Sequence, residues 1–350
     1  MSIEILPCAR SGSDSSTLVG WLSRRRPASL VAQTDRVSPG PHPIPHGRTA
    51  RRIEWSHLPP SVRSAIQDRT GSPVTSAESR TSGFTPGLAS VLTCEDGGKH
   101  FVKAASTKAQ RMFAEAYREE ARKLEALPAE APAARLLWSL DVDDWFAVGL
   151  EHVESRQPRR PWTRVDLDAS LDALEVVADL LTPPPSGLGL DDVATEFAPF
   201  PGYWDHLRTH GPALTNLEEA AALAGRYREV VGGDTLVHTD VRDDNILIRP
   251  DGGAVLCDWN FPCVGADWLD TVLLMVGPRG DGLDVEAVLS SRRLTRDVPP
   301  ESVDIVLALL VGYFLRQADE PVPPTSPHLR DHQRWQGEVC WEWLCERRGW

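Results

Sequence analysis

The sequence predicts an α+β protein with two lobes, a small N-terminal lobe built on an antiparallel sheet and a larger, mainly helical C-terminal lobe. Two observations predict this division. Between residues 88 and 150, short β-prone runs with glycine-containing turns lie on either side of a single long helical segment. From residue 163 onward helical periodicity prevails, except for a polar loop and hairpin at residues 236–258.

The first 52 residues differ in composition from the rest of the chain. They are rich in Ser, Pro and Arg and have few periodic apolar positions, so we expect residues 1–52 to form a disordered or loosely attached extension. The N-terminal lobe is then expected at about residues 53–150 and the C-terminal lobe at 151–350. A chain of 350 residues has room for two lobes with a cleft between them.

The elements of the small lobe follow from turn residues and periodicity. A short helix is expected from Pro60 to Arg69, because Gly71 can end it. A strand is expected at 88–94, followed by a turn at 95–98 and a second strand that carries Lys103. Two further strands are expected at 134–140 and 145–150.

A long helix is expected between these strand pairs. Residues 108–127 contain neither Gly nor Pro, and Pro128 follows. Glu120 lies on the apolar stripe of this helix, whereas Glu119 is turned about 100° away. Because a carboxylate on a buried face is costly unless it is paired, we expect Glu120 to pair with Lys103. The alternative is that Glu120 lies at the edge of the stripe and stays solvated. The stripe consists of Phe113, Tyr117, Leu124 and Leu127.

Lys103 is unusual in this chain. Lysines stand only at positions 99, 103, 108 and 123, among 37 Lys and Arg residues. Its compact ammonium is a better point charge for a phosphate group than a guanidinium would be.

The most informative stretch is the polar loop at 238–245 and the hairpin that follows it. The turn Pro250-Asp251-Gly252-Gly253 predicts a tight hairpin, which brings Asn245 and Asp258 together at the ends of paired strands. Asp240 lies one loop away. Three oxygen-bearing side chains in one place suit a hard cation such as Mg²⁺. The alternative is a surface hairpin whose turn residues happen to be Asp and Asn.

The pattern His238-x-Asp240-x-x-x-x-Asn245, followed by Asp258, resembles the catalytic and metal-binding loops of the aminoglycoside phosphotransferase family, within the protein-kinase-like superfamily. Glu120-Ala121-Arg122-Lys123-Leu124 is similar to the family's Glu-Ala-x-x-Leu helix. The resemblance covers about residues 75–350. It implies a protein-kinase-like fold, with ATP and Mg²⁺ as cofactors and transfer of the γ-phosphoryl group to a hydroxyl of a small molecule.

The resemblance also implies roles for single residues. Asp240 would be the catalytic base, and Asn245 and Asp258 would hold Mg²⁺. Lys103, fixed by Glu120, would position the nucleotide phosphates.

Two further parts of the nucleotide site follow only from their positions in the resemblance. Ser82, Gly83 and Phe84 would lie in a loop that covers the phosphates. Glu151 and Val153 would lie in the hinge that meets the adenine.

Arg242 and the structural aspartate after the metal loop have two interpretations each. Arg242 would face the transferring phosphoryl group as a second catalytic residue, or pair with Asp243 or Asp244. The structural aspartate that the family has after its metal loop would be Asp270 or Asp267. His238 is expected to order the loop by hydrogen bonding and not to transfer protons.

The sequence also departs from its relatives. Thr239 stands where the family commonly has Gly, and Asp258-Trp259-Asn260 stands where protein kinases have Asp-Phe-Gly. Neither change removes a catalytic atom, and the first leans away from a protein kinase, in agreement with the absence of an activation-segment signature.

The acceptor is less well specified than the donor. An aminoglycoside-like antibiotic is one candidate. The alternatives are a metabolic kinase of choline, homoserine or sugar type and a catalytically silent nucleotide-binding regulatory module. The net charge of −13 argues against nucleic acid as a partner and suits a cationic acceptor.

Acceptor contacts are expected from helices at about 163–181, 202–210 and 217–231 and from the region after Pro300. In the first helix the acidic side chains would meet amino groups of a sugar or form a solvated face opposite an apolar stripe. The C-terminal tryptophans would line a pocket or belong to the core. The acidic residues are Asp166, Asp168, Asp172, Glu175 and Asp179, and the tryptophans are Trp335, Trp341, Trp343 and Trp350.

A cytoplasmic location is expected. The six cysteines include no Cys-x-x-Cys pair and predict reduced thiols. The longest apolar run, residues 305–315, is shorter than the roughly 20 residues that a membrane span requires.

Overall fold

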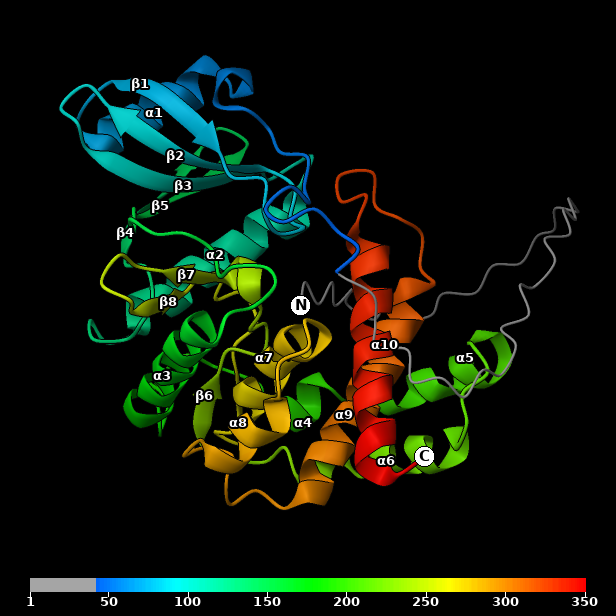
Figure 1. The fold of residues 1–350 in the computed structure, drawn as a ribbon. Coiled ribbons are helices and arrows are strands. Elements are labelled where there is room, and N and C mark those ends of the chain that lie inside the picture. Colours follow the sequence, from blue (N-terminus) through cyan, green and yellow to red (C-terminus); the bar gives the residue numbers. More distant parts are fainter. Residues whose placement is uncertain (1–41) are drawn as a thin grey trace, which may run out of the picture.

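Two lobes make up the computed structural model, which describes residues 42–350 (Figure 1). The small lobe holds a five-stranded sheet in which each strand is antiparallel to its neighbours, in the order β1-β2-β3-β5-β4. The prediction of an α+β fold with an antiparallel N-terminal sheet is confirmed. The strands are β1 (Val74–Ser79), β2 (Leu88–Cys94), β3 (Lys99–Ser106), β4 (Leu136–Val142) and β5 (Trp145–Glu151).

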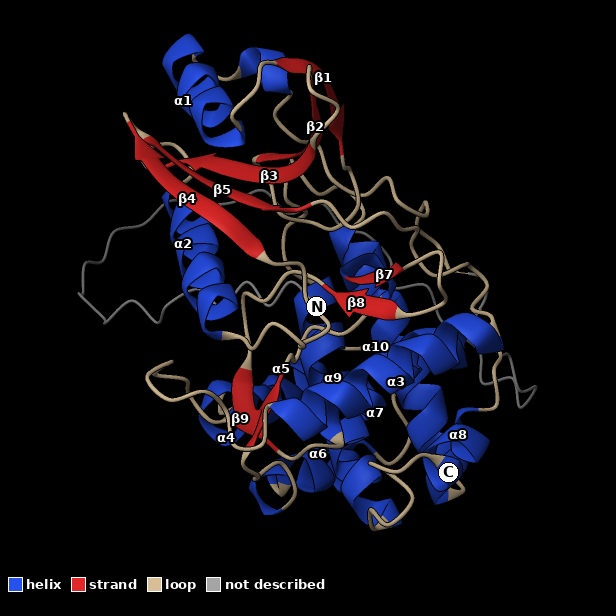
Figure 2. Ribbon diagram, turned by 90° about the vertical axis from the view of Figure 1, so that its left-hand side faces the viewer, coloured by secondary structure: helices blue, strands red, loops and turns tan. Residues whose placement is uncertain are grey.

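Two helices cover opposite faces of this sheet (Figure 2). Helix α1 (Pro60–Thr70) packs on one face with Val102 and Ala104, whereas α2 (Arg111–Ala126) packs on the other with Ala105. Since side chains alternate along a strand, Lys103 belongs to the α2 face. Gly71 ends α1 at φ +76°, as its sequence predicts.

Helix α2 is shorter than the predicted segment 108–127. Its first helical residue is Arg111, because residues 107–110 form a turn in which Ser106 Oγ accepts from the Lys108 and Ala109 amides at 3.3 and 3.1 Å. The hydroxyl of Ser106 thus gives these amides a partner outside a helix.

The larger lobe is mainly helical, as predicted, and contains two small strand pairs. Strands β6 (Thr235–Val237) and β9 (Cys263–Gly265) form one pair, and β7 (Ile246–Ile248) and β8 (Ala254–Leu256) form the other. The predicted helix at 217–231 ends at Gly225 and continues as a 3₁₀ turn, because glycine is a poor helix former.

The remaining helices are α3 (Arg164–Leu180), α4 (Val193–Glu196), α5 (Tyr203–His210), α6 (Leu217–Gly225), α7 (Leu269–Gly280), α8 (Val285–Ser291), α9 (Pro300–Ala318) and α10 (Leu329–Arg348). The 3₁₀ helices are η1 (Trp55–His57), η2 (Phe200–Gly202), η3 (Tyr227–Glu229) and η4 (Asp243–Asn245).

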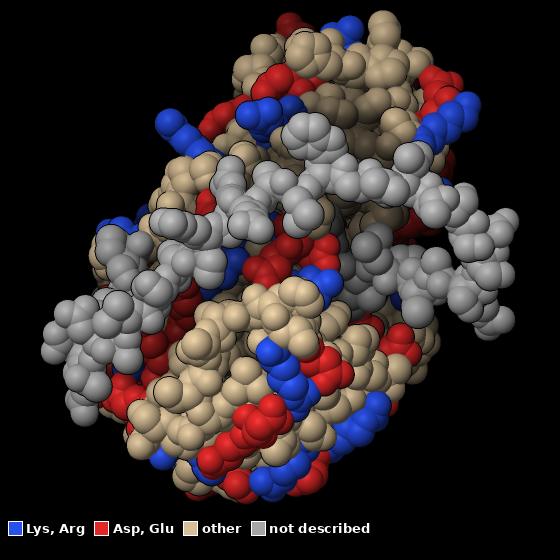
Figure 3. Space-filling view, turned by 90° about the vertical axis from the view of Figure 1, so that its right-hand side faces the viewer, with Lys and Arg blue, Asp and Glu red and all other residues tan. Residues whose placement is uncertain are grey.

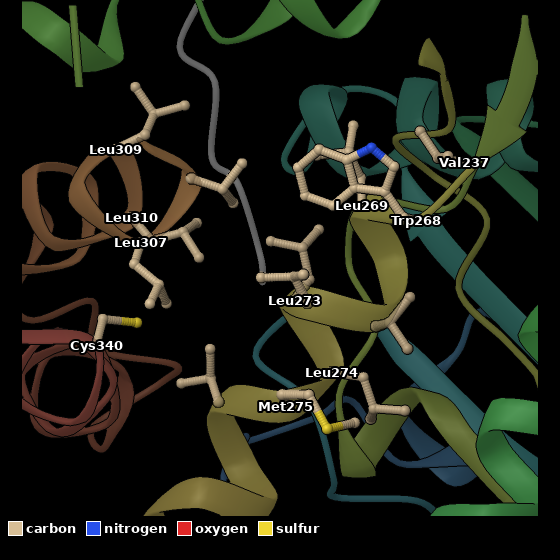
Figure 4. Close-up of a cluster of buried hydrophobic side chains, with 14 of the residues drawn as sticks. Val237, Trp268, Leu269, Leu273, Leu274, Met275, Leu307, Leu309, Leu310 and Cys340 are labelled. Atoms are coloured by element: carbon tan, nitrogen blue, oxygen red, sulfur yellow. The ribbon is translucent and has the colours of Figure 1, made fainter. Parts of the chain in front are cut away.

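The core of the larger lobe supports the polar loop. Figure 4 shows apolar side chains of α7, such as Leu273, facing those of α9 and Cys340 of α10. The same cluster includes Val237, the last residue of β6, directly before the loop. Helices α9 and α10 approach closely at Gly337, where a Cβ atom would lie 2.6 Å from Leu315 Cδ2. The polar loop at residues 238–245 therefore begins directly after a buried residue of the core.

The expectation of a loose extension is wrong for residues 42–52, while residues 1–41 lie outside the described part. Thr49 Oγ1 donates to the Gly83 carbonyl at 2.5 Å, and the Arg51 amide donates to the Thr325 carbonyl at 2.8 Å. Ile44 is buried against Phe84. Although residues 42–52 are polar, they pack against the rest of the structure, because backbone carbonyls of both lobes accept their hydrogen bonds.

No helix within residues 42–350 is both long enough and apolar enough to cross a membrane. The described cysteines are all free thiols: Cys94, Cys257, Cys263, Cys340 and Cys345.

Candidate active site

Lys103 and Glu120 form the ion pair that the helix periodicity predicts. Lys103 Nζ lies 2.8 Å from both Oε1 and Oε2 of Glu120. Both side chains are buried, and Glu120 is only 1% exposed. The alternative of a solvated Glu120 is therefore wrong. Strand β3 and helix α2 hold the two charges in place from different elements of the small lobe.

Asp258 joins this pair from the larger lobe. Its Oδ1 accepts from Lys103 Nζ at 2.9 Å. Burial alone would raise the pKa of Asp258, but the Lys103 ammonium lowers it to about 2. Burial opposes the charge of Lys103 as well, yet the carboxylates of Asp258 and Glu120 raise its pKa above the ordinary value. Burial raises the pKa of Glu120, and the neighbouring Lys103 ammonium opposes this shift.

Asp258 is also held in the left-handed backbone region, at φ +69°. A non-glycine residue rarely adopts this conformation, which clusters at functional sites. Asn260 Nδ2 donates to Asp258 Oδ1, so the turn after β8 fixes the carboxylate. The register Ile246↔Leu256, with the Cys257 amide bonded to the Asn245 carbonyl at 3.0 Å, sets Asn245 beside this turn as the predicted hairpin requires.

The loop after β6 is ordered by Asp270, one of the two predicted alternatives. Asp270 Oδ2 accepts from the His238 amide at 2.6 Å and Oδ1 accepts from the Thr239 amide at 2.9 Å. Asp270 is buried, whereas Asp267 is exposed. Burial raises the pKa of Asp270 to about 6, although these two amides favour its charged form.

Thr239 is the point at which the loop turns. Its φ is +62°, a conformation that glycine adopts freely and a β-branched residue does not. Besides the amide bond to Asp270, Thr239 Oγ1 donates to the Phe261 carbonyl at 2.6 Å. These two hydrogen bonds hold Thr239 in this conformation, at a position where the aminoglycoside phosphotransferase family commonly has Gly.

His238 acts as a neutral link in the loop. Its Nε2 faces the Cys257 carbonyl at 3.0 Å and must donate, while Nδ1 accepts from the Asp240 amide at 3.3 Å. Burial lowers the pKa of His238 to about 4. The ring therefore orders the backbone around Asp240, as predicted.

Asp240 is buried and its carboxylate is oriented by two neighbours. Asn245 Nδ2 donates to Asp240 Oδ2 and to the Asp240 carbonyl, each at 2.9 Å. Arg242 Nη1 lies 3.2 Å from Asp240 Oδ1. Because the Asn245 amide nitrogen is engaged with Asp240, the Oδ1 oxygen is the atom that remains for a metal ion.

Arg242 forms one of the salt bridges considered from the sequence. Its Nε donates to Asp244 Oδ1, whereas Asp243 pairs with Arg160. The Arg242 guanidinium also lies over the Phe84 ring at 5.3 Å. Its Nη2 is buried and has no hydrogen-bond partner within residues 42–350.

A cavity of about 520 Å³ lies between the lobes and brings most of the predicted residues together. Apolar side chains of both lobes line it, including Ala89, Phe101 and Leu247. Such a cavity is large enough for a small organic ligand. The predicted site residues along its wall are Lys103, Asn245 and Asp258, the loop residues Ser82 and Gly83, and the hinge residues Glu151 and Val153.

Phe84 does not line this cavity. It is buried between Ile44 and Leu329, and its ring stacks on His332 with centroids 5.4 Å apart. The loop between β1 and β2 thus presents Ser82 and Gly83 to the cavity, while Phe84 attaches the loop to α10. Gly83 has φ +80°, which a side chain would strain.

Residues 42–46 lie beside the polar loop at residues 238–245. The His42 ring lies 4.1 Å from the Trp335 ring and 5.1 Å from the His332 ring. His46 Nε2 lies 3.7 Å from Asp243 Oδ2. These contacts place the segment where the N-terminal half of α10 meets the catalytic loop.

The acidic face of α3 is mostly paired with arginines. Asp166 is buried and accepts from Arg156 Nη1 at 2.8 Å, so the prediction that it is solvated is wrong. Arg292 pairs with Asp168 and Asp172 at 2.9 and 2.6 Å. On the face shown in Figure 3, acidic side chains also gather between the two lobes.

The C-terminal tryptophans have different positions. Trp343 is 1% exposed and belongs to the core of the larger lobe. Trp335 lies beside the catalytic loop against His42, and Trp341 stacks near Trp350 with ring centroids 5.9 Å apart. Trp335 and Trp343 thus belong to the core, and Trp341 and Trp350 pack against it.

The donor set fits Mg²⁺. Asn245 and Asp258 line the same cavity and can offer oxygen ligands, and Asn260 Oδ1 is a buried acceptor with no hydrogen-bond partner among residues 42–350. Residues 42–350 contain no group of three or more His, Cys, Asp or Glu side chains that could hold a metal alone. This agrees with a cation that takes its other ligands from substrate phosphates and water.

The residues of the cavity wall that sequence reasoning missed include Arg52, Tyr117 and Arg156. Tyr117 was assigned to the apolar stripe, and its hydroxyl donates to the Pro86 carbonyl at 3.3 Å. Arg52 fell in the segment expected to be loose. No pattern in the sequence marks Arg52 or Tyr117 as a residue of the cavity wall.

No known family model matches the chain, and no curated protein matches it. Solved structures do. Choline kinase LicA from Streptococcus pneumoniae is 15% identical, with a TM-score of 0.53, and the match covers 79% of this chain and 99% of that one.

Two antibiotic kinases match as well. Spectinomycin phosphotransferase APH(9)-Ia, solved with ADP and spectinomycin, is 9% identical with a TM-score of 0.58. A thermostable mutant of aminoglycoside phosphotransferase APH(4)-Ia, solved with ADP and hygromycin B, is 11% identical with a TM-score of 0.57. Each of these matches covers 82% of this chain and 98% of the other. The chain therefore has the protein-kinase-like fold of the aminoglycoside phosphotransferases and choline kinase.

Proposed function

We propose that this protein is an ATP- and Mg²⁺-dependent phosphotransferase that moves the γ-phosphoryl group to a hydroxyl of a small molecule. One observation carries the proposal. Lys103, Asn245 and Asp258 line one cavity, where Glu120 pairs with Lys103 and the Asn245 amide contacts Asp240. A cation for phosphates, oxygen ligands for a metal and a buried carboxylate are the parts that phosphoryl transfer needs.

Each residue has a role that its contacts support. Asp240 would accept the proton of the acceptor hydroxyl, because Asn245 and Arg242 hold its carboxylate in one orientation. Lys103 would pair with the nucleotide phosphates. Bound Mg²⁺, held by Asn245 and Asp258, would supply neutralisation of the phosphate charge. Arg242 would add a positive charge near the transferring group.

The hinge would receive the base of the nucleotide. Glu151 ends β5, where it pairs with His100 of β3, and both Glu151 and Val153 line the cavity. Ser82 and Gly83 would lie over the phosphates. The solved complexes of similar fold contain ADP, which supports a nucleotide as the ligand.

The acceptor has two candidate classes. Solved antibiotic kinases of this fold support an aminoglycoside-like acceptor, and choline kinase supports a metabolic amino alcohol. Both classes are cationic, in keeping with a net charge of −13 and with the acidic side chains between the lobes. A cytoplasmic location is in keeping with the free thiols.

The test is ADP release from Mg·ATP by the purified protein over a panel of aminoglycosides, macrolides, hygromycin-type compounds, choline, homoserine and sugars. Asp240→Asn serves as the blank. Release that depends on one acceptor class and disappears in the variant supports the proposal and names the class. If no acceptor stimulates release although ATP binds, the catalytically silent nucleotide-binding module is the better description.

A further inference from the structure

Arg52 connects the N-terminal segment to the loop that covers one end of the cavity. Its Nη1 donates to the Thr85 carbonyl at 2.6 Å and its Nη2 donates to the Ser82 carbonyl at 2.7 Å. Both acceptors are neutral. The guanidinium lines the same cavity as Lys103 and Asp258.

Arg52 forms no salt bridge within residues 42–350, although its charge helps to lower the pKa of Asp258 from a distance. Within residues 42–350 no carboxylate oxygen lies within 4.0 Å of its guanidinium nitrogens, although most arginines of this chain form such pairs. Two of its five N–H groups are used by the carbonyls, and the buried Nε has no hydrogen-bond partner in the described part of the chain. A half-buried cation whose hydrogen-bond acceptors are all neutral is stabilised when an anion binds beside it.

The position of the guanidinium indicates which anion this is. A Cβ atom at Gly83 would lie 3.3 Å from Arg52 Nη2 and 3.9 Å from Asp244 Oδ2. The Arg52 guanidinium therefore lies at the tip of the loop, on the side of the cavity where Asp244 also lies. In the proposed function this is the end of the cavity that receives the phosphates, since Lys103 also lines it.

We propose that Arg52 is a second cation for the nucleotide phosphates, supplied by the segment before the small lobe, and that its free N–H groups donate to phosphate oxygens. This inference rests on the proposed function for the presence of a nucleotide. A guanidinium suits the task because it can hold the loop carbonyls with one edge and phosphate oxygens with another. The segment at 42–52 would then belong to the nucleotide site.

The decisive experiment compares affinities for ligands that differ only in phosphate number. The affinities of the full-length protein and of Arg52→Met for adenosine, AMP, ADP and ATP are measured by calorimetry, with Mg²⁺ present. We expect the variant to bind adenosine like the wild type and to bind ATP about 10- to 100-fold more weakly, which is the loss of one or two charge-assisted hydrogen bonds. Arg52→Lys should recover part of the affinity for ATP.

Two control variants separate this role from simpler ones. Arg51→Met removes an exposed charge from the adjacent position and should leave every affinity unchanged. Thr49→Val removes another hydrogen bond to the same loop, the one that Thr49 Oγ1 donates to the Gly83 carbonyl, without changing the charge. Its affinity for ATP should stay within about threefold of the wild type.

The outcomes are distinct. If Thr49→Val weakens ATP binding as much as Arg52→Met does, Arg52 only supports the loop and the proposed phosphate contact is wrong. The same conclusion follows if Arg52→Met weakens adenosine and ATP equally, or neither. If the wild type binds no adenine nucleotide, the proposed function itself fails. Weak ATP binding in Arg52→Met alone, with ADP release still dependent on Asp240, supports both proposals.

Discussion

Lys103 Nζ and Asp258 Oδ1 lie 2.9 Å apart, although 155 positions separate these residues in the chain. The contact joins the two lobes directly at the cavity. Strand β3 supplies the cation, and the turn after β8 supplies the anion in a left-handed backbone conformation. This ion pair therefore holds the two lobes together at one end of the cleft, and Glu120 is the third charged residue of the cluster.

The first prediction concerns the free energy of unfolding. Lys103→Met leaves two neighbouring carboxylates buried without their cation, and we expect it to cost about 3–5 kcal/mol. Glu120→Gln should cost less, because Lys103 keeps Asp258 as a partner. Urea unfolding measures both values.

The double variant tests whether the charges act together. Lys103→Met with Glu120→Gln should cost at least about 1 kcal/mol less than the two single costs combined, because the second change removes one of the unpaired carboxylates. Glu119→Gln, on the exposed face of the same helix, should change the stability by less than about 0.5 kcal/mol. Strictly additive costs would show that the pair contributes nothing beyond its separate members.

The second prediction distinguishes Asp270 from Asp267. Asp270→Asn places an amide where two backbone N–H groups need an acceptor, so one of them loses its partner. We expect a cost of about 1–3 kcal/mol and a weaker hold on the loop before Asp240. Asp267→Asn is the matched control on the same segment and should be neutral in thermal unfolding. Equal effects at the two positions would contradict the role assigned to Asp270.

The third prediction is a pH dependence. Because the folded state raises the pKa of Asp270 from 3.8 to about 6, its stabilising contribution is present below pH 4 and is lost as the pH rises to 6. Because the folded state lowers the pKa of His238 from 6.5 to about 4, its contribution is present above pH 6.5 and is lost as the pH falls to 4. Each contribution is about 3 kcal/mol and the two oppose each other.

Single variants should expose each contribution. In Asp270→Asn, the free energy of unfolding should rise more steeply between pH 4 and 6 than in the wild type. In His238→Gln, the rise should be shallower. Urea titrations at several pH values between 4.5 and 7 measure both slopes, and Asp267→Asn should superimpose on the wild type. Parallel curves for all four proteins would rule out titration of this pair.

The sequence predicted those parts of the site that local rules determine. Asn245 and Asp258 came together because a tight turn fixes the register of a hairpin, and Glu120 was found because helix periodicity marks one face. Arg52 and Phe84 depend instead on contacts between distant segments, and Arg52 binds backbone carbonyls, which every residue has. Asp166 was misjudged because its arginine partner lies outside its helix. No periodicity within a segment reports such partners.

The last prediction concerns the metal. Asp258→Asn keeps an oxygen that can accept from Lys103, so the protein should fold, but it removes the one charged ligand of the proposed Mg²⁺ site. Acceptor-dependent ADP release should then fall by at least about 100-fold, and its half-maximal Mg²⁺ concentration should rise. Asp251→Asn, an exposed carboxylate in the same hairpin, is the control. A Mg²⁺ titration of both variants decides the matter, because an unchanged midpoint in Asp258→Asn would place the metal elsewhere. A lower rate with an unchanged midpoint would instead assign Asp258 to the orientation of Lys103.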